Sequence, residues 1–119
     1  MPHNNNDKFL TFLGLCKKAG ALETGEERVA LSQKKGKAKL ILIASDAAEN
    51  TRSKAAQIAE WGKLTVLDLP YTKEIIGGAV GTRACAILSV TTAAMAKAVR
   101  EKLTLDDTGK SETDETTAV

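Results

Sequence analysis

Few residues in this sequence have the types and spacing that enzyme chemistry requires. Asp46 follows a strongly apolar segment, where open α/β sheets often place a general base or a phosphoacceptor. The only histidine, His3, is close to the N-terminus, and no acidic residue beside Asp46 completes a magnesium site. We therefore predict that the protein is not an enzyme, that it holds no metal or cofactor, and that Asp46 has a role in a turn or at a helix start.

The two cysteines, Cys16 and Cys85, lie in separate apolar segments without the short spacing of a zinc site. We predict reduced, buried thiols in a cytosolic chain, and a disulfide is the alternative. Neither cysteine indicates catalysis.

The charged residues point instead to a polyanionic partner. Residues 1–103 carry 16 Lys and Arg against 10 Asp and Glu, whereas residues 104–119 carry 1 against 5. A lysine cluster around Gly36 consists of Lys34, Lys35, Lys37 and Lys39, and Lys17 and Lys18 add to the positive charge. Such a cationic surface can hold phosphates. The alternative is a solvated helix end, where cations favour the helix dipole and need no ligand.

The glycines at 77, 78 and 81 are spaced similarly to a nucleotide-binding loop. Such loops follow a strand and begin a helix, whereas this segment precedes an apolar strand pattern. We therefore interpret residues 77–81 as irregular backbone with tight turns and close approach to a partner, and not as a dinucleotide site.

Alternating helix and strand patterns position these groups. The expected helices cover residues 8–19, 24–35, 51–61, 72–76 and 92–103, and the expected strands cover residues 22–23, 39–44, 64–69 and 84–90. The expected helix caps are Asn6, Thr24, Thr51, Thr72 and Thr92, with Glu27 completing a capping box. The aliphatic run at 39–44 does not alternate, which is typical of a parallel strand buried on both faces. The pattern predicts an α/β/α sandwich of three layers, with helices on both faces of a mixed, mainly parallel, four-stranded sheet.

The composition predicts one domain over residues 7–103, between a disordered segment 1–6 and a disordered acidic tail 104–119. The polar N-terminal residues do not resemble a secretory signal. The longest strongly apolar run, residues 40–44, is too short to span a bilayer. We therefore expect a cytoplasmic protein that has no contact with membranes and is a monomer.

Three segments, taken in order, resemble a known family. They read LGLCKKAG at 13–20, TGEE at 24–27 and GKAKLILIASDA at 36–47, and Val80-Gly81 precedes the last strand. This order is similar to the bacterial YlxQ-like branch of the kink-turn-binding ribosomal protein family over about residues 8–103. The resemblance implies the same sandwich fold, RNA binding without catalysis, and ribosomal or other structured RNA as the partner.

The resemblance also implies where RNA binds. In well-studied binders the second helix starts with Lys-Gly-x-Asn-Glu, followed by a lysine one turn later. Those positions here hold Thr24, Gly25, Glu26, Glu27, Arg28 and Leu31, so that only the glycine is shared. Two further segments are expected to contact RNA, namely Ala44, Ser45 and Asp46, and Gly81, Thr82, Arg83 and Ala84. Phosphate contacts are expected from Lys35 and Lys37.

The departures from the helix-start motif leave two functional interpretations open. Arg28 offers a donor of suitable geometry, and Arg83 places a cation in the loop before the last strand. In contrast, Glu27 and Leu31 replace donors, and the added carboxylates repel phosphate, which favours a protein-interaction module on the same fold. Our expectation is an RNA-binding, ribosome-associated or ribosomal-protein-like chain, with the interaction module as the alternative.

Overall fold

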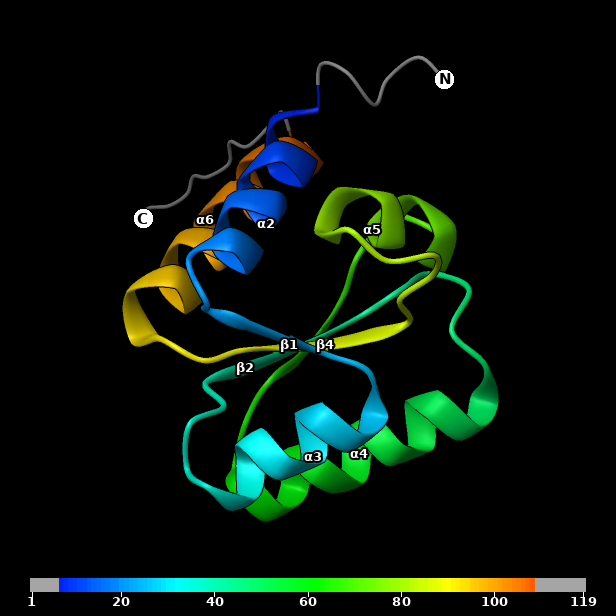
Figure 1. Ribbon diagram of the computed structural model, residues 1–119, viewed down its shortest axis with the longest axis vertical. Helices are drawn as coiled ribbons and strands as arrows, with labels where there is room; N and C mark the ends of the chain where they lie inside the picture. Colours follow the sequence, from blue (N-terminus) through cyan, green and yellow to red (C-terminus); the bar gives the residue numbers. More distant parts are fainter. Residues whose placement is uncertain (1–6, 109–119) are drawn as a thin grey trace.

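The computed structural model describes residues 7–108, with side chains through Leu103 (Figure 1). Its elements are α2 Lys8–Lys18, β1 Leu22–Thr24, α3 Glu26–Lys34, β2 Leu40–Ile43, α4 Glu49–Gly62, β3 Val66–Asp68, α5 Lys73–Val80, β4 Ile87–Val90 and α6 Ala93–Thr108. Helix α6 continues to Thr108, past the boundary predicted at Leu103. The segments 1–6 and 109–119, for which the sequence predicts disorder, lie outside the described residues.

The four strands form one mixed sheet in the order β1-β4-β2-β3. Strand β4 is antiparallel to both β1 and β2, and only β2 and β3 are parallel. The prediction of a mainly parallel sheet is therefore wrong. It relied on the continuous apolar run of β2, but that run reflects burial on both faces, and helices can cover both faces of an antiparallel sheet as well.

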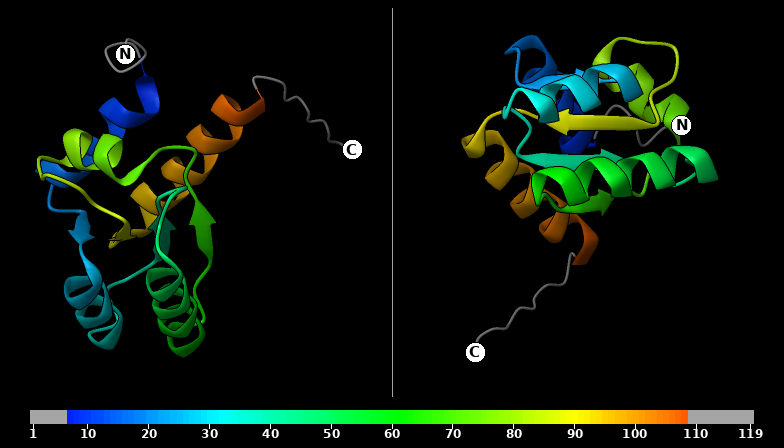
Figure 2. Two further views of the ribbon diagram at one scale, coloured as in Figure 1. Left: turned by 90° about the vertical axis from the view of Figure 1, so that its right-hand side faces the viewer. Right: turned by 90° about the horizontal axis from the view of Figure 1, so that it is seen from below.

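Helices cover both faces of this sheet (Figures 1 and 2). Helices α2, α5 and α6 lie on one face, and α3 and α4 lie on the other. Strand β2 divides its side chains between these faces, because successive residues of a strand point to opposite sides. Leu40 and Leu42 join the core under α2, α5 and α6, whereas Ile41 and Ile43 join the core under α3 and α4.

Three of the five expected helix caps are wrong. Thr24 pairs with Leu88 inside the sheet, and Gly25 takes the cap position of α3 without a side-chain hydrogen bond, so the capping box with Glu27 is absent. Helix α4 already begins at Glu49. Asp7, not the preceding asparagine, caps α2 by accepting from the Leu10 amide at 3.0 Å. Strand pairing and tertiary contacts outweigh such local preferences.

The caps at Thr72 and Thr92 are confirmed. The Thr72 hydroxyl accepts from the Ile75 amide at 3.3 Å, and the Thr92 hydroxyl accepts from the Met95 amide at 3.2 Å. Both residues precede their helices without being drawn into a strand, and so the local capping chemistry decides the helix start.

The sequence predicts that the helix beginning near Thr72 stops at residue 76, before the glycines. This prediction is wrong, because α5 continues through Gly77 and Gly78 to Val80. A Cβ built on Gly77 would lie 2.7 Å from the Cα of Ala84, so this glycine allows the helix to pack directly on the loop that follows it. The helix ends at Gly81, whose φ of 89° is unfavourable for other residues. Glycine is thus used here for close packing inside a helix.

Both cysteines are unpaired and buried, as predicted. The Cys16 thiol donates to Met95 Sδ at 3.6 Å, and the Cys85 thiol donates to the carbonyl oxygen of Ile87 at 3.4 Å. Burial raises the pKa of both thiols, because desolvation disfavours the thiolate.

Within residues 7–108, no helix has the length and apolar character that a bilayer span requires.

Two neighbouring glycines of α5 offer a matched test of this packing. Gly77→Ala should lower the free energy of unfolding by about 1–3 kcal/mol, because the new methyl group collides with the backbone of the loop at 83–84. Gly78→Ala should raise it by up to about 1 kcal/mol, because nothing lies within 4 Å and alanine favours helix. Urea unfolding measures both values, and equal effects of the two substitutions would contradict the proposed contact.

The raised thiol pKa values predict low reactivity. Iodoacetamide at pH 8 should alkylate Cys16 and Cys85 much more slowly in the native protein than in urea, because only exposed thiolate reacts. The folded protein also holds these protons more tightly than the unfolded chain does. The free energy of unfolding should therefore be unaffected by them below the ordinary thiol pKa of 9.0 and fall as the pH rises above it. Mass spectrometry follows the alkylation, and equal alkylation rates in the native protein and in urea would refute the predicted low reactivity.

Candidate functional site

One edge of the sheet collects the three segments that the sequence predicts to form a site. Strands β1, β2 and β3 point the same way, because β4 is antiparallel to β1 and β2 while β3 is parallel to β2. Their carboxyl ends therefore share an edge with the start of β4. The segments 24–28, 44–46 and 81–84 all begin or end at this edge, although they are far apart in the sequence.

Two of these segments enclose a cavity of about 290 Å³, here called the edge pocket. It is lined by Thr24, Gly25, Glu26, Thr51, Thr82, Ala84, Cys85, Ala86 and Ile87. The amide of Gly25 donates to the carbonyl oxygen of Ile87 at 3.0 Å, which joins the end of β1 to the start of β4. The φ of Gly25 is 93°, and a Cβ built there would meet nothing within 4 Å. Backbone conformation, not crowding, thus favours glycine at this position.

Hydrogen bonds hold several polar groups of the first turn of α3 and of the neighbouring loop. Glu26 accepts from the Thr51 hydroxyl at 3.1 Å, which ties α3 to α4 across the edge pocket. Arg28 forms an exposed ion pair with Glu23 at 3.5 Å. The Thr82 hydroxyl donates to the carbonyl oxygen of Ala84 at 3.3 Å and holds the second loop in shape. The pocket rim therefore combines a positioned carboxylate with hydroxyl groups.

The outer face of α3 carries Glu27, Arg28 and Leu31, which are exposed to solvent. The Leu31 side chain is 49% exposed even though it is apolar. These three residues extend from the pocket rim along the helix and do not line the pocket itself. Arg83 is likewise exposed, in the loop between Thr82 and Ala84.

The segment at 44–46 supports the edge through its backbone. The buried Ala44 donates its amide to the carbonyl oxygen of Ala86 at 2.9 Å, and the Ser45 amide donates to that of Tyr71 at the same distance. The Asp46 carboxylate accepts from the Lys73 amide at 2.9 Å, in the first turn of α5. The predicted role of Asp46 at a helix start is therefore confirmed, and the helix in question is α5.

Arg52 is a structural residue of this edge that sequence analysis did not identify. Its guanidinium donates to the Ser45 carbonyl oxygen at 3.1 Å and to the Asp68 carboxylate at 2.9 Å. It thereby ties the ends of β2 and β3 to α4. No local pattern marks this arginine, because its acceptors come from separate loops.

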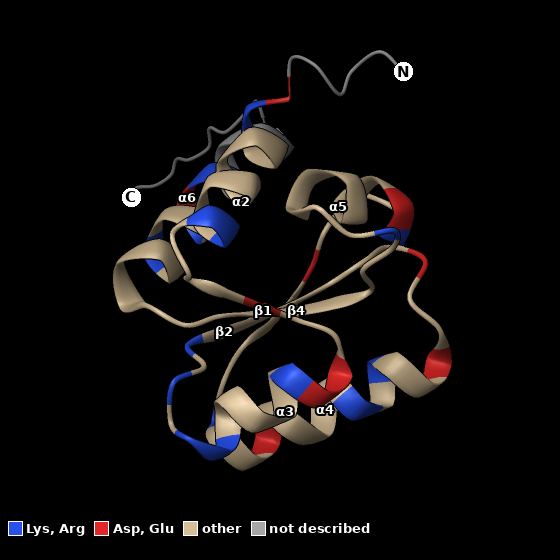
Figure 3. Ribbon diagram, in the orientation of Figure 1, with Lys and Arg blue, Asp and Glu red and all other residues tan. Residues whose placement is uncertain are grey.

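The structure does not bring Lys35 and Lys37 to the edge pocket. They follow the last turn of α3, at the opposite end of the helix from Gly25. The amide of Lys39 donates to the carbonyl oxygen of Val90, at the far end of β4. The lysine cluster therefore lies at the opposite edge of the sheet (Figure 3), and the phosphate contacts expected from Lys35 and Lys37 would be made away from the edge pocket. The lysine cluster is close to Gly25 in the sequence, but the length of α3 separates the two in space.

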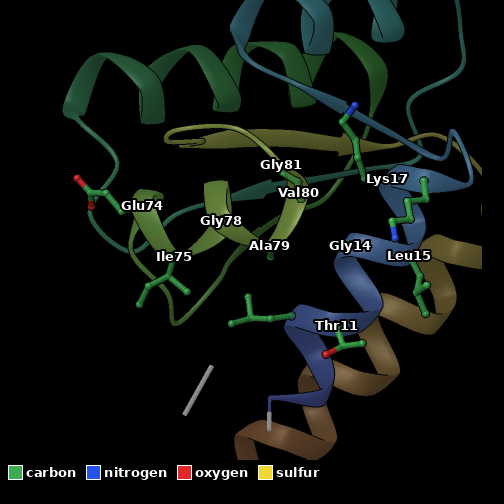
Figure 4. A pocket seen from close by; sticks show the side chains of 12 residues that line it. Thr11, Gly14, Leu15, Lys17, Glu74, Ile75, Gly78, Ala79, Val80 and Gly81 are labelled. Carbon is green, nitrogen blue, oxygen red and sulfur yellow. The ribbon is translucent and has the colours of Figure 1, made fainter. Parts of the chain in front are cut away.

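Lys17 and Lys18 lie closer to the site than the lysine cluster does. They line a groove of about 690 Å³ between α2 and α5, together with Leu15 and Gly81 (Figure 4). A Cβ on Gly14 would lie 2.8 Å from the carbonyl oxygen of Ala79, so glycine brings these helices close together. The charge of Lys17 also opposes part of the burial effect that raises the Cys85 pKa.

Among residues 7–103, whose side chains the structure describes, no three His, Cys, Asp or Glu side chains are grouped to hold a metal ion. The edge pocket instead offers backbone amides, hydroxyl groups and a carboxylate, and the exposed Arg28 and Arg83 lie on the segments that frame it. Such groups recognise a ligand by shape and hydrogen bonding.

Comparisons with known proteins place this chain in a family. No family model matches it. The RNA-binding protein YlxQ of Enterococcus faecium is 33% identical over 75 residues, which are 63% of this chain and 73% of that protein. A structure of a protein with unknown function from Bacillus halodurans has a TM-score of 0.74 at 26% identity, covering 81% of this chain and 96% of its own.

The 15.5kD RNA binding protein of Giardia lamblia has a TM-score of 0.63 at 19% identity, covering 79% of this chain and 80% of its own, and this likeness shows the fold alone. The identity and coverage shared with the Enterococcus protein carry the assignment further. This chain belongs to the YlxQ family.

Proposed function

We propose that this protein binds structured RNA, without catalysis, through the edge pocket and the two segments that frame it. The observation that carries the proposal is the convergence of segments 24–26 and 82–87 on one pocket at the edge of the sheet. RNA as the ligand is supported by the name of the Enterococcus protein, which is called RNA-binding.

The edge pocket suits an unpaired RNA base better than a regular double-stranded RNA helix. Proteins recognise irregular RNA mainly through bases that have left the stack, which they hold by their edges. An internal loop with a sharp bend, as in a kink-turn, presents such a base beside two closely spaced backbones. The open space beside Gly25 would admit one of these backbones, and the exposed Arg83 would bind its phosphates.

Charge divides the roles of the side chains around the pocket. A carboxylate repels phosphate but accepts hydrogen bonds from base amino groups. Glu26, held in place by Thr51, would therefore contact a base edge. Arg28, Arg83 and Lys17 would contact phosphates, with Thr82 as an additional donor. This division accounts for a binding site that retains acidic residues.

We further propose that the RNA belongs to the ribosome, and that the protein acts as a cytoplasmic monomer. The resemblance to ribosomal proteins supports this setting. A protein-interaction module on the same fold is the alternative, and the exposed Leu31 would then be part of its contact surface.

Arg83 provides a direct test of RNA binding. Arg83→Gln should weaken the binding of a kink-turn RNA by about tenfold and lower the slope of log affinity against log salt by about 1, because one phosphate contact is lost. Lys97→Gln, an equal charge change on α6, should have little effect. Filter binding over a series of salt concentrations measures both. A wild-type protein that shows neither preference for kinked RNA nor a salt slope would favour the interaction module.

Glu26 and Glu27 form a matched pair, because both carboxylates lie in the first turn of α3. If Glu26 accepts a hydrogen bond from a base, Glu26→Gln should weaken kink-turn binding by about fivefold, or ~1 kcal/mol. Glu27→Gln should leave binding unchanged or strengthen it, because it only removes repulsion. Tighter binding by Glu26→Gln in the same titration would show that this carboxylate opposes RNA.

A further inference from the structure

Helices α3 and α4 run side by side in the same direction on one face of the sheet. Near their starts, the Thr51 hydroxyl donates to Glu26. At their ends, a Cβ built on Gly62 would lie 3.0 Å from Cγ of Gln33. The end of α4 therefore lies beside the end of α3, where the lysine cluster begins.

The far end of these helices carries a concentration of positive charge. Lys63, which follows α4, joins the four lysines of the cluster, and all five residues are exposed. Neither of the two ion pairs among the described residues involves them. The exposed Glu60 offsets part of this charge. The remaining excess of cations favours a polyanionic partner.

Trp61 lies two residues before Lys63, at the same end of α4, and is 60% exposed. It is the only tryptophan of the chain. A large aromatic side chain left in water beside several cations is the combination with which proteins bind single-stranded nucleic acid, since bases stack on the ring while cations hold the phosphates.

A polar groove borders the edge pocket and runs along the first turns of α4. Glu26 lines the edge pocket and also a second cavity of about 400 Å³, whose other residues are Asn50, Ser53, Lys54 and Gln57 of α4. Trp61 follows Gln57 by one helical turn and Asn50 by three, and so it continues the exposed stripe of α4 that lines this cavity. The stripe thus connects the two ends of the helices.

We propose that this outer face of α3 and α4 binds a single-stranded RNA segment that flanks the structured element in the edge pocket. Trp61 stacks on one base, and the lysine cluster and Lys63 hold the phosphates beyond it. The inference rests on the proposed function, and it gives the lysines a role although they lie away from the edge pocket. An acidic protein segment fits the lysines but makes less use of the polar groove and the exposed ring.

The geometry sets a minimum length for this flank. Asn50 and Trp61 are eleven residues apart in α4, or about 17 Å along the helix axis. At about 3.4 Å per stacked nucleotide, a strand needs roughly five nucleotides to reach Trp61 from the edge pocket. Shorter flanks should add no affinity.

Tryptophan fluorescence tests the inference directly, because Trp61 is the only source of the signal. The full chain is titrated with a kink-turn RNA that either lacks flanks or carries a single-stranded flank of about ten nucleotides, twice the estimated reach. Anisotropy of the labelled RNA measures affinity in parallel. The flanked RNA should bind more tightly and quench Trp61, whereas the RNA without flanks should bind without quenching.

Variants assign the gain to this surface. Trp61→Ala should weaken binding of the flanked RNA by about five- to 150-fold and leave the RNA without flanks unaffected. The double variant Lys35→Gln/Lys37→Gln should lower the salt slope for flanked RNA by about 1.4, because two phosphate contacts to a single strand are lost. The control Lys97→Gln, on the opposite face of the sheet, should bind both RNAs as the wild type does.

The remaining outcomes separate this inference from the proposed function. Binding of both RNAs with equal affinity and no quenching would overturn the inference and leave the edge-pocket proposal standing. Quenching by a free single strand, without binding of the unflanked RNA, would support the second surface and refute kink recognition. Stronger quenching by a polyglutamate peptide than by the flanked RNA would overturn the inference in favour of an acidic protein partner.

Discussion

The insertion of β4 between β1 and β2 is the constraint on which the candidate site depends. Because β4 runs antiparallel to both neighbours, its first residues lie beside the last residues of both strands. Two backbone hydrogen bonds fix this junction, from Gly25 to Ile87 and from Ala44 to Ala86. The loop before β4 thereby meets the start of α3, and the edge pocket forms between segments that are distant in the sequence.

The packing of α5 helps to hold the loop before β4 in place. Gly77 lets the helix backbone approach Ala84, and Gly81 turns the chain out of the helix toward Arg83. On the neighbouring strands, Arg52 ties the ends of β2 and β3 to α4. These supports are mostly backbone or buried contacts, which leaves the side chains on the pocket rim available to a ligand.

Charge is distributed by the same geometry. The pocket rim combines Glu26 with nearby cations, while the lysine cluster lies one helix length away at the other edge of the sheet. Helix α3 spans the distance between these regions, since it begins at Glu26 beside the edge pocket and ends at Lys34 in the lysine cluster. The molecule therefore presents two surfaces of different chemistry at opposite ends of this helix.

The sequence by itself determined most of the helices and strands, because periodicity and composition are local properties. The caps at Thr72 and Thr92 and the buried cysteines also follow from it. Tertiary structure decided what depends on distant partners. The direction of β4, the loss of the Thr24 cap to strand pairing, the helical state of Gly77 and the separation of Lys35 from the pocket are all of this kind. Each is determined by contacts across the sheet or between helices, and such contacts leave no signal in the spacing of neighbouring residues.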